Sequence, residues 1–242
     1  MTFRVDNLGF MITGFAQGVM DFEFHNAVYP RMDFYYRQDL GVMAGSGMEF
    51  NFIHGLKLGV TVRALRRSLI DESYSAIEIS DEDFTDNVQD DKVTDEEYYM
   101  DFGLIYTLPV KRFFHTDIGV VYQNVDAPHH DENLGIKKQL NIGIAIERYF
   151  KKSSILLSAD FRDVSNKASE DDDIFKRLHF GIEWSLPMFA IRAGVSQGYL
   201  TYGATMDFGI LIIEAASYGE EIGSYSGQKL DRRYVIQFQF GW

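Results

Sequence analysis

The sequence contains no cysteine and only 4 prolines among its 242 residues. The absence of cysteine excludes a disulfide framework and any metal site built on thiolates. A sheet tolerates proline poorly, because proline has no backbone N–H to donate to the neighbouring strand. All four prolines fall outside the alternating segments described below, at Pro30, Pro109, Pro128 and Pro187. Their placement is what a strand-rich chain requires.

Long apolar runs and basic charge are also scarce. No apolar run approaches the roughly 18 residues of a transmembrane helix, so none is expected. The net charge of −13 argues against nucleic acid as a partner, because phosphates require neutralisation by Lys and Arg. The start, MTFRVDNLGF, lacks the basic end and apolar core of a secretory signal. If the protein is exported, we expect Met1 to be an artificial start or the chain to lack its N-terminal segment.

What the sequence does contain is strict alternation, clearest in its last stretch, DRRYVIQFQFGW. One face carries only apolar side chains, and the other carries polar, small or aliphatic ones, which is the period-2 pattern of a β-strand. A terminal strand that ends on aromatic residues resembles the closing strand of bacterial outer-membrane barrels. We therefore expect an assembly signal at Phe238, Phe240 and Trp242.

Eleven further segments alternate in the same way, separated by turn residues and without a helical period. We expect a loop at 25–38 after the first strand. The predicted strands lie at about 7–24, 40–52, 56–64, 98–108, 114–123, 140–147, 155–162, 178–185, 189–196, 200–207, 209–218 and 233–242.

The links between these strands are sorted by length. Those after every second strand are short, near His54, Pro109, Lys152, Pro187 and Phe208. The others are long and polar, except for Gln197–Tyr199. Short turns at one end and long loops at the other are typical of outer-membrane barrels, with both termini on the periplasmic side.

The polar faces are rich in glycine and in opposite charges, where a soluble sheet would favour Thr, Lys or Glu. A bilayer inverts a barrel, so that apolar residues face lipid and polar residues fill the lumen. Aromatic residues near strand ends fit interfacial girdles: Tyr98, Tyr106, Tyr122, Tyr149, Phe150, Tyr199 and Trp242. We predict one all-β domain over 1–242, a transmembrane antiparallel up-and-down β-barrel of about 12 strands, in a range of about 10–14. A soluble sandwich or lipocalin-like barrel is the alternative.

The negative charge is concentrated at 71–97, which holds 12 acidic residues and one Lys. We expect this segment to be a solvated extracellular loop that folding does not need, because like charges cannot pack. Its core, DEDFTDNVQDD, also has the oxygen ligands that Ca²⁺ prefers, but it lacks the spacing of an EF-hand. No metal site or cofactor is therefore predicted.

Charged residues on the polar faces are the candidate site. They are expected either to form a structural network across the lumen or to line a path for solute. His129, His130 and Asp131 are a catalytic alternative, but no nucleophile motif accompanies them, and we predict no enzymatic activity. The predicted lumenal residues are Glu49, Arg63, Asp101, Asp117, Glu147, Asp160, Arg162, Glu183 and Arg192.

The C-terminal 90 or so residues resemble a known group. The segments LSADFRDV, HFGIEWSLP, IRAGVSQGYLTYGATMDFG and SYGEEIGSYSGQ, followed by the final strand, are similar to the TraF-like outer-membrane proteins, which in turn resemble PorV and FadL-like barrels. The resemblance implies an integral protein of the bacterial outer membrane that passes or binds an apolar or amphipathic small molecule. It also implies membrane lipid and the barrel-assembly machinery as partners.

A second function stays open, that of a structural or docking barrel whose loops hold a partner protein, as the resemblance to PorV implies. A soluble β-barrel that binds a ligand is the third possibility.

Overall fold

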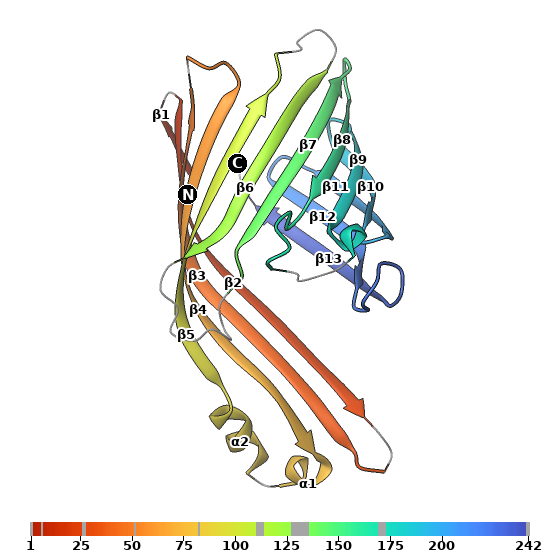
Figure 1. The fold of residues 1–242 in the computed structure, drawn as a ribbon. Helices are drawn as coiled ribbons and strands as arrows, with labels where there is room; N and C mark the ends of the chain where they lie inside the picture. Colours follow the sequence, from red (N-terminus) through yellow and green to blue (C-terminus); the bar gives the residue numbers. More distant parts are fainter. Residues whose placement is uncertain are drawn as a thin grey trace. The chain divides into compact units, whose positions relative to one another are not determined.

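A computed structural model describes residues 2–5, 7–25, 28–50, 52–81, 83–109, 114–126, 136–168 and 173–240. Thirteen strands form one antiparallel sheet, in which each strand is hydrogen-bonded to its neighbours in the sequence (Figure 1). Among the described residues β1 and β13 are the edges of this sheet. The all-β, up-and-down fold predicted from the alternation is confirmed.

The N-terminal strands are long and the C-terminal ones are short. The first strands are β1 (Thr2–Val5), β2 (Leu8–His25), β3 (Arg31–Glu49), β4 (Leu56–Ser75) and β5 (Val93–Thr107). Next come β6 (His115–Asp126), β7 (Gln139–Tyr149), β8 (Ser154–Phe161) and β9 (Leu178–Ser185). The last are β10 (Phe189–Ser196), β11 (Tyr199–Asp207), β12 (Leu211–Glu221) and β13 (Leu230–Phe240). Each predicted strand corresponds to one of these, and β1, which pairs with β2, is additional.

Two predicted loops are shorter than expected. The prediction of a loop at 25–38 is wrong for most of that range, because β3 begins at Arg31. The acidic segment 71–97 begins and ends in strand, since β4 continues to Ser75 and β5 starts at Val93. Charged and polar side chains are interspersed with apolar ones in these extensions, and neighbouring strands pair them: Ser73 hydrogen-bonds to Asp33, and His25 lies 2.9 Å from Asp33.

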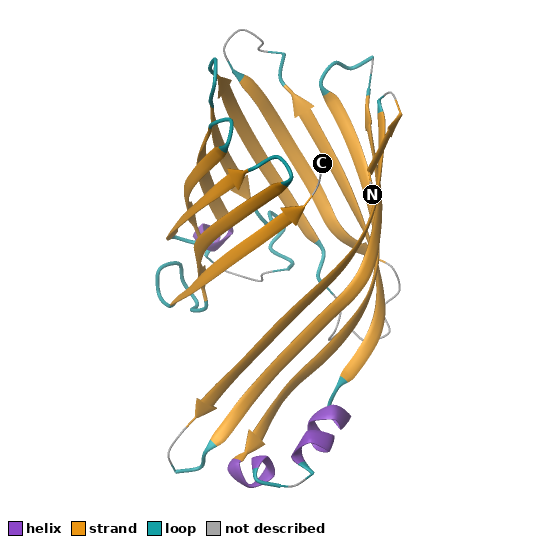
Figure 2. Ribbon diagram, turned by 180° about the vertical axis from the view of Figure 1, so that it is seen from behind, coloured by secondary structure: helices purple, strands orange, loops and turns teal. Residues whose placement is uncertain are grey.

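The middle of the acidic segment is helical rather than irregular. It forms two short helices, α1 (Ala76–Ile79) and α2 (Phe84–Asp90), drawn in purple in Figure 2. Ser75 and Glu78 form a reciprocal capping box at the start of α1, and the hydrogen bonds from Ser75 lower the pKa of Glu78. Tyr74 stacks edge-on against Phe84 and donates a hydrogen bond to Asp91. These contacts pack the segment in spite of its charge.

The predicted sorting of links by length holds for most of the sheet but is wrong at its start, because the β2–β3 link at 26–30 is shorter than the β3–β4 link at 50–55. Short turns join β7 to β8, β9 to β10 and β11 to β12, at 150–153, 186–188 and 208–210. At the other ends, β4–β5 and β8–β9 have long links, and the latter contains a 3₁₀ helix, η1 (Ile174–Arg177). The predicted exception is a two-residue turn, in which Gln197 and Gly198 both have positive φ, as a tight hairpin of matching twist requires.

The chain divides into two compact units, which we describe separately. The long-strand unit comprises Met1–Gly47, Val60–Asp101 and Asn124–Ile136. The short-strand unit comprises Met48–Gly59, Phe102–Gln123 and Lys137–Trp242. Buried apolar side chains are few among the described residues, and most lie in the long-strand unit: Leu65, Ile70, Tyr74 and Tyr99, with Ala190 in the short-strand unit.

Candidate functional site

The register of the short-strand unit separates a polar face from an apolar one. Gly119 pairs with Gly143, Ser158 with Gly181, and Arg192 with both Glu183 and Gly203, so these residues share one face. The opposite face holds apolar side chains that remain at least 39% exposed: Ile142, Ile144, Leu157, Phe180, Ile182, Trp184, Ile191, Leu200, Tyr202, Met206, Ile236 and Phe238. The face assignments predicted from alternation are confirmed here, and the apolar face is the uncovered one.

A chain of charged and hydroxyl groups crosses four strands on the polar face. Arg192 on β10 lies 2.5 Å from Glu183 on β9 and 3.6 Å from Glu214 on β12. Its guanidinium also donates to the hydroxyl of Thr205 on β11, which in turn donates to Glu214. Ser185 donates to the other oxygen of Glu183. One cation thus contacts two carboxylates and connects β9 to β12, and this chain of groups keeps one excess negative charge.

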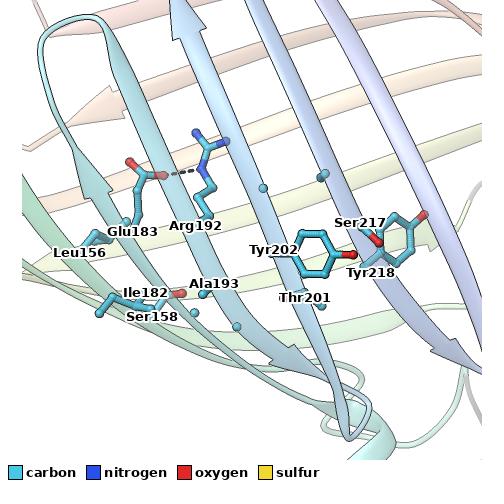
Figure 3. Close-up of a pocket in the computed structure, with 14 residues that line it drawn as sticks. Leu156, Ser158, Ile182, Glu183, Arg192, Ala193, Thr201, Tyr202, Ser217 and Tyr218 are labelled. Carbon is cyan, nitrogen blue, oxygen red and sulfur yellow. Dashed lines mark hydrogen bonds and ion pairs between the residues drawn. The ribbon is translucent and has the colours of Figure 1, made fainter.

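Next to this chain lies a hollow of about 280 Å³. It exists because Gly181, Gly194 and Gly203 project no side chain where three neighbouring strands meet. The Glu183–Arg192 ion pair lies at one side of the hollow and Tyr218 at the other (Figure 3). A side chain at position 194 would meet the carbonyl oxygen of Phe180 at 2.4 Å, so close approach of the strands requires glycine there.

A second hollow, of about 600 Å³, adjoins the first along the polar face and shares Ser158, Gly181, Thr201 and Tyr218 with it. Its lining is more strongly polar and includes Asp160, Arg162, His179, Ser196 and Glu220. The two hollows therefore form a path over glycine and hydroxyl groups, with charged groups at intervals. Such a lining offers both donors and acceptors to the head of an amphipathic molecule.

His179 and Ser196 lie in the second hollow and form the kind of pair from which a nucleophile could be built. The Nδ1 of His179 and the hydroxyl of Ser196 are 2.8 Å apart. Within the described residues, no carboxylate hydrogen-bonds to the other ring nitrogen, so the third member of a catalytic triad is missing. The pair is a cross-strand hydrogen bond between residues in register.

The long-strand unit holds a separate cluster of charges that is almost fully buried. The guanidinium of Arg67 binds both oxygens of Asp39, at 2.7 and 2.9 Å. Arg63 binds Asp101 at 3.0 Å and lies over the ring of Tyr99. Charged groups that leave water need partners of this kind.

Tyr99 itself is 0% exposed. Its hydroxyl donates to Glu97 and accepts from the backbone N–H of Ile136. Asn124 completes the cluster by accepting from Arg63 and donating its backbone N–H to Asp101. With every member tied to its neighbours in this way, we interpret the cluster as structural.

Of the nine predicted lumenal residues, the structure joins four into two ion pairs, Arg63–Asp101 and Glu183–Arg192. Within the described ranges, the structure does not pair the other five with one another. Asp117 accepts a hydrogen bond from Thr107, Glu147 accepts one from Tyr149, and Glu49 is the last residue of β3. Asp160 and Arg162 line the larger hollow.

Sequence reasoning missed four charged members, Asp39, Arg67, Glu97 and Glu214. Three of them could have been found by continuing the alternation of β3, β4 and β5 through their charged ends. Glu214 is identified only by the register of the structure, which places it opposite Thr205.

A third cluster orders the loops at one end of the short-strand unit. Glu221, the last residue of β12, accepts hydrogen bonds from the hydroxyl of Tyr199 and from the backbone N–H groups of Gly223, Gln228 and Lys229. Burial acts to raise the pKa of Glu221, but these hydrogen bonds outweigh it and lower the pKa to about 2.

Two further contacts extend this cluster to other loops. Ser226 donates its hydroxyl to the carbonyl of Gln197 and its backbone N–H to Asp173, which precedes η1. The loop 222–229 is thereby fastened to the Gln197–Gly198 turn and to the β8–β9 link.

The structure does not test the predictions about metal ions, the assembly signal and the catalytic alternative. In the part of the chain that the structure describes, no three His, Asp or Glu side chains are placed to hold a metal ion. No described helix has the length and apolar character needed to cross a membrane. Phe238 is 60% exposed on the apolar face, while the side chain of Phe240, the residue Trp242 and the residues His129, His130 and Asp131 lie outside what the structure describes.

Comparison with known proteins finds no matching family model, no match among curated proteins and no matching solved structure. The resemblance to TraF-like, PorV-like and FadL-like proteins therefore remains a prediction from the sequence segments that suggested it.

Proposed function

We propose that this chain is an integral β-barrel protein of the bacterial outer membrane that binds or passes an apolar or amphipathic small molecule. One observation carries the proposal: in the short-strand unit the apolar face is exposed, and the opposite face bears the charged chain of Glu183, Arg192 and Glu214. A soluble sheet would cover its apolar face with a second layer, whereas lipid covers it in a membrane barrel.

Most strand lengths fit the same proposal. A transmembrane strand needs about 9–11 residues, and β7, β12 and β13 have 11 each and β11 has 9, whereas β8, β9 and β10 are slightly shorter, with 8 each. β2, β3 and β4, with 18, 19 and 20 residues, are well past this length, as expected of strands that continue outside the bilayer. The short turns then lie on the periplasmic side, as does the end of β13, and the acidic segment with α1 and α2 lies outside the cell.

The hollow over Gly181, Gly194 and Gly203 is the proposed binding site. Its glycine floor leaves room for a narrow apolar chain, and Arg192 and Glu183 at its side can receive a polar head. The C-terminal strand is the proposed signal for the barrel-assembly machinery, with Phe238, Phe240 and Trp242 as its apolar residues.

Liposome uptake of a labelled long-chain fatty acid tests the transport role. Gly181→Val fills the hollow at little backbone cost, because the added carbon meets only the flexible hydroxyl of Ser158. We expect this variant to lower uptake strongly. Gly119→Val is the matched control, since it makes the same change on the same face outside the hollow, with nothing closer than 4.0 Å. Equal uptake by both variants would remove the hollow from the path.

A docking barrel is the second candidate, favoured by the loop cluster around Glu221. Three connections are fastened there into one ordered surface, with Phe175 and Tyr225 exposed upon it. A barrel that inserts into bilayers but passes no fatty acid, and whose loop substitutions prevent capture of a partner protein, would favour this role. A wild-type chain that is folded and monomeric in plain buffer would favour the soluble ligand-binding alternative and overturn both membrane roles.

A further inference from the structure

An arginine between two aromatic rings stands at the short-turn end of the short-strand unit. The guanidinium carbon of Arg148 lies 5.6 Å from the ring centre of Phe114 and 5.2 Å from that of Phe150. Cation–π contacts of this kind hold a guanidinium by its faces. Among the described residues, none of its N–H groups meets a carboxylate.

Arg148 belongs to the apolar face and not to the polar one. It pairs with Ile155 across the β7–β8 ladder, two positions beyond Ile146 and four beyond Ile144 on the same side. The neighbouring acid, Glu147, projects to the other face, where it accepts a hydrogen bond from Tyr149. The cation is thus exposed on the apolar face of the sheet.

The turn after β7 adds positive charge. Lys151 and Lys152 are both exposed in the turn 150–153, which is closed by a hydrogen bond from Phe150 to Ser153. In a chain of net charge −13, three cations within five consecutive residues are a local reversal of sign. An anionic partner is what such a segment complements.

Other exposed aromatic and apolar residues lie at the same short-turn end of the unit as Arg148. The other short turns of the same unit carry Phe52, Met188 and Phe208, which are all more than half exposed, and Trp184 faces outward near the end of β9. Aromatic girdles of this kind occur at the level of lipid headgroups. If the proposed function holds, Arg148 lies at the periplasmic interface of the membrane.

We infer that Arg148, held between Phe114 and Phe150 and supported by Lys151 and Lys152, binds the phosphate of an anionic phospholipid headgroup. A planar guanidinium can donate two parallel N–H bonds to a phosphate, which an ammonium cannot do. The two rings hold the guanidinium at the interface through cation–π contacts. This inference rests on the proposed membrane location and adds a specific lipid contact to it.

The test uses the full chain inserted into vesicles of phosphatidylglycerol and phosphatidylcholine in equal amounts. After mild extraction, native mass spectrometry measures how much of each lipid stays bound. We expect wild type to retain phosphatidylglycerol preferentially and Arg148→Gln to reduce that preference about five-fold, the effect of one cation near an anionic surface. Arg148→Lys should fall between them, because it keeps the charge and loses the paired donors.

Arg232→Gln is the charge-matched control. Arg232 lies on the same face of β13, near its loop end, and donates to the carbonyl of Leu200. We expect its lipid preference to equal that of wild type. Should Arg148→Gln fold poorly, the double substitution Lys151→Gln, Lys152→Gln in the exposed turn tests the same charge cluster and should also lower the preference.

Two failures are distinguishable. Wild type that inserts into the vesicles, with Arg148→Gln and the double variant retaining the same lipids as wild type, overturns the headgroup site and leaves the proposed function intact. Wild type that does not insert overturns the proposed function, and the headgroup site with it.

Discussion

The long and the short strands of this protein differ in where their charged and apolar side chains lie. β4 has 20 residues and β9 has 8, while a bilayer needs about 9–11 tilted residues. On β4 the exposed apolar run ends after Val62, and Arg67 farther along is buried against Asp39. On β9 the apolar residues Phe180, Ile182 and Trp184 are all exposed.

This difference separates two sources of stability. The extended halves of the long strands are held by paired charges, hydrogen bonds and a small apolar core, and these do not depend on lipid. The short strands have almost no buried apolar side chains of their own, so we expect the bilayer to supply most of their apolar environment. Each prediction below tests one side of this division.

The largest effect is expected from Arg67→Met, which leaves the carboxylate of Asp39 buried without its bidentate partner. Breaking such a pair costs about 3–5 kcal/mol of unfolding free energy, and we expect the lower end because Arg37 lies 3.8 Å from Asp39. Denaturant unfolding should give the same loss in detergent and in bilayers.

The control for this variant is Arg233→Met, which breaks exposed ion pairs with Glu220 and Asp231 and should cost about 1 kcal/mol. Similar losses for the two variants would mean that the Asp39–Arg67 pair gains nothing from its burial.

Ile144→Arg is the corresponding test of the lipid-facing side. Ile144 lies at the middle of β7 and is 39% exposed on the apolar face. Arginine at the bilayer midplane costs about 2–4 kcal/mol in a transmembrane barrel. We expect a loss of this size for unfolding from vesicles and from detergent micelles, because both cover the apolar face.

Ile77→Arg makes the same change at an exposed position of α1 and should have little effect in either medium. If Ile144→Arg lowers the free energy of unfolding no more than Ile77→Arg does, then β7 does not face lipid.

The Glu221 cluster predicts an acid transition at the loops of the short-strand unit. The folded pKa of about 2 lies below the ordinary value of 4.5, so the stabilisation is fully present above pH 4.5. It is lost as the pH falls from 4.5 towards 2. Limited proteolysis across this range should show cleavage in 222–229 increasing with acid, and Glu221→Gln should be cleaved readily at every pH.

The smallest effect is expected at the acidic segment. Ser75→Ala removes one half of the capping box of α1 and should cost about 1 kcal/mol locally. Hydrogen exchange should increase in residues 76–91 while the global unfolding midpoint stays unchanged. A shift of that midpoint would show that α1 is coupled to the long strands, and the acidic segment would then contribute to folding after all.

The sequence was most informative where apolar alternation was bounded by turn residues. The predicted limits of β9 and β10 agree with the structure to the residue, because Pro187 and the Gln197–Gly198 pair mark their ends. The predictions failed where alternation continued with charged residues. Asp33 and Ser73 then belong to strands, since each finds its partner on the neighbouring strand.

The candidate site was only partly accessible from sequence for a related reason. Charges at alternate positions identified Glu183 and Arg192, but their partner Glu214 depends on the register of three ladders. The pair Asp39–Arg67 joins residues that are 28 positions apart. The hollow itself arises from glycines on adjacent strands, and only the register brings them to one place.

The strand order has a consequence for how the protein is made. In the described sheet every strand pairs with the segments immediately before and after it, so no pairing waits for a distant part of the chain. Contacts of low sequence separation form fast, because little loop entropy is lost in making them. Each hairpin can therefore form beside the one that precedes or follows it, without waiting for a distant strand.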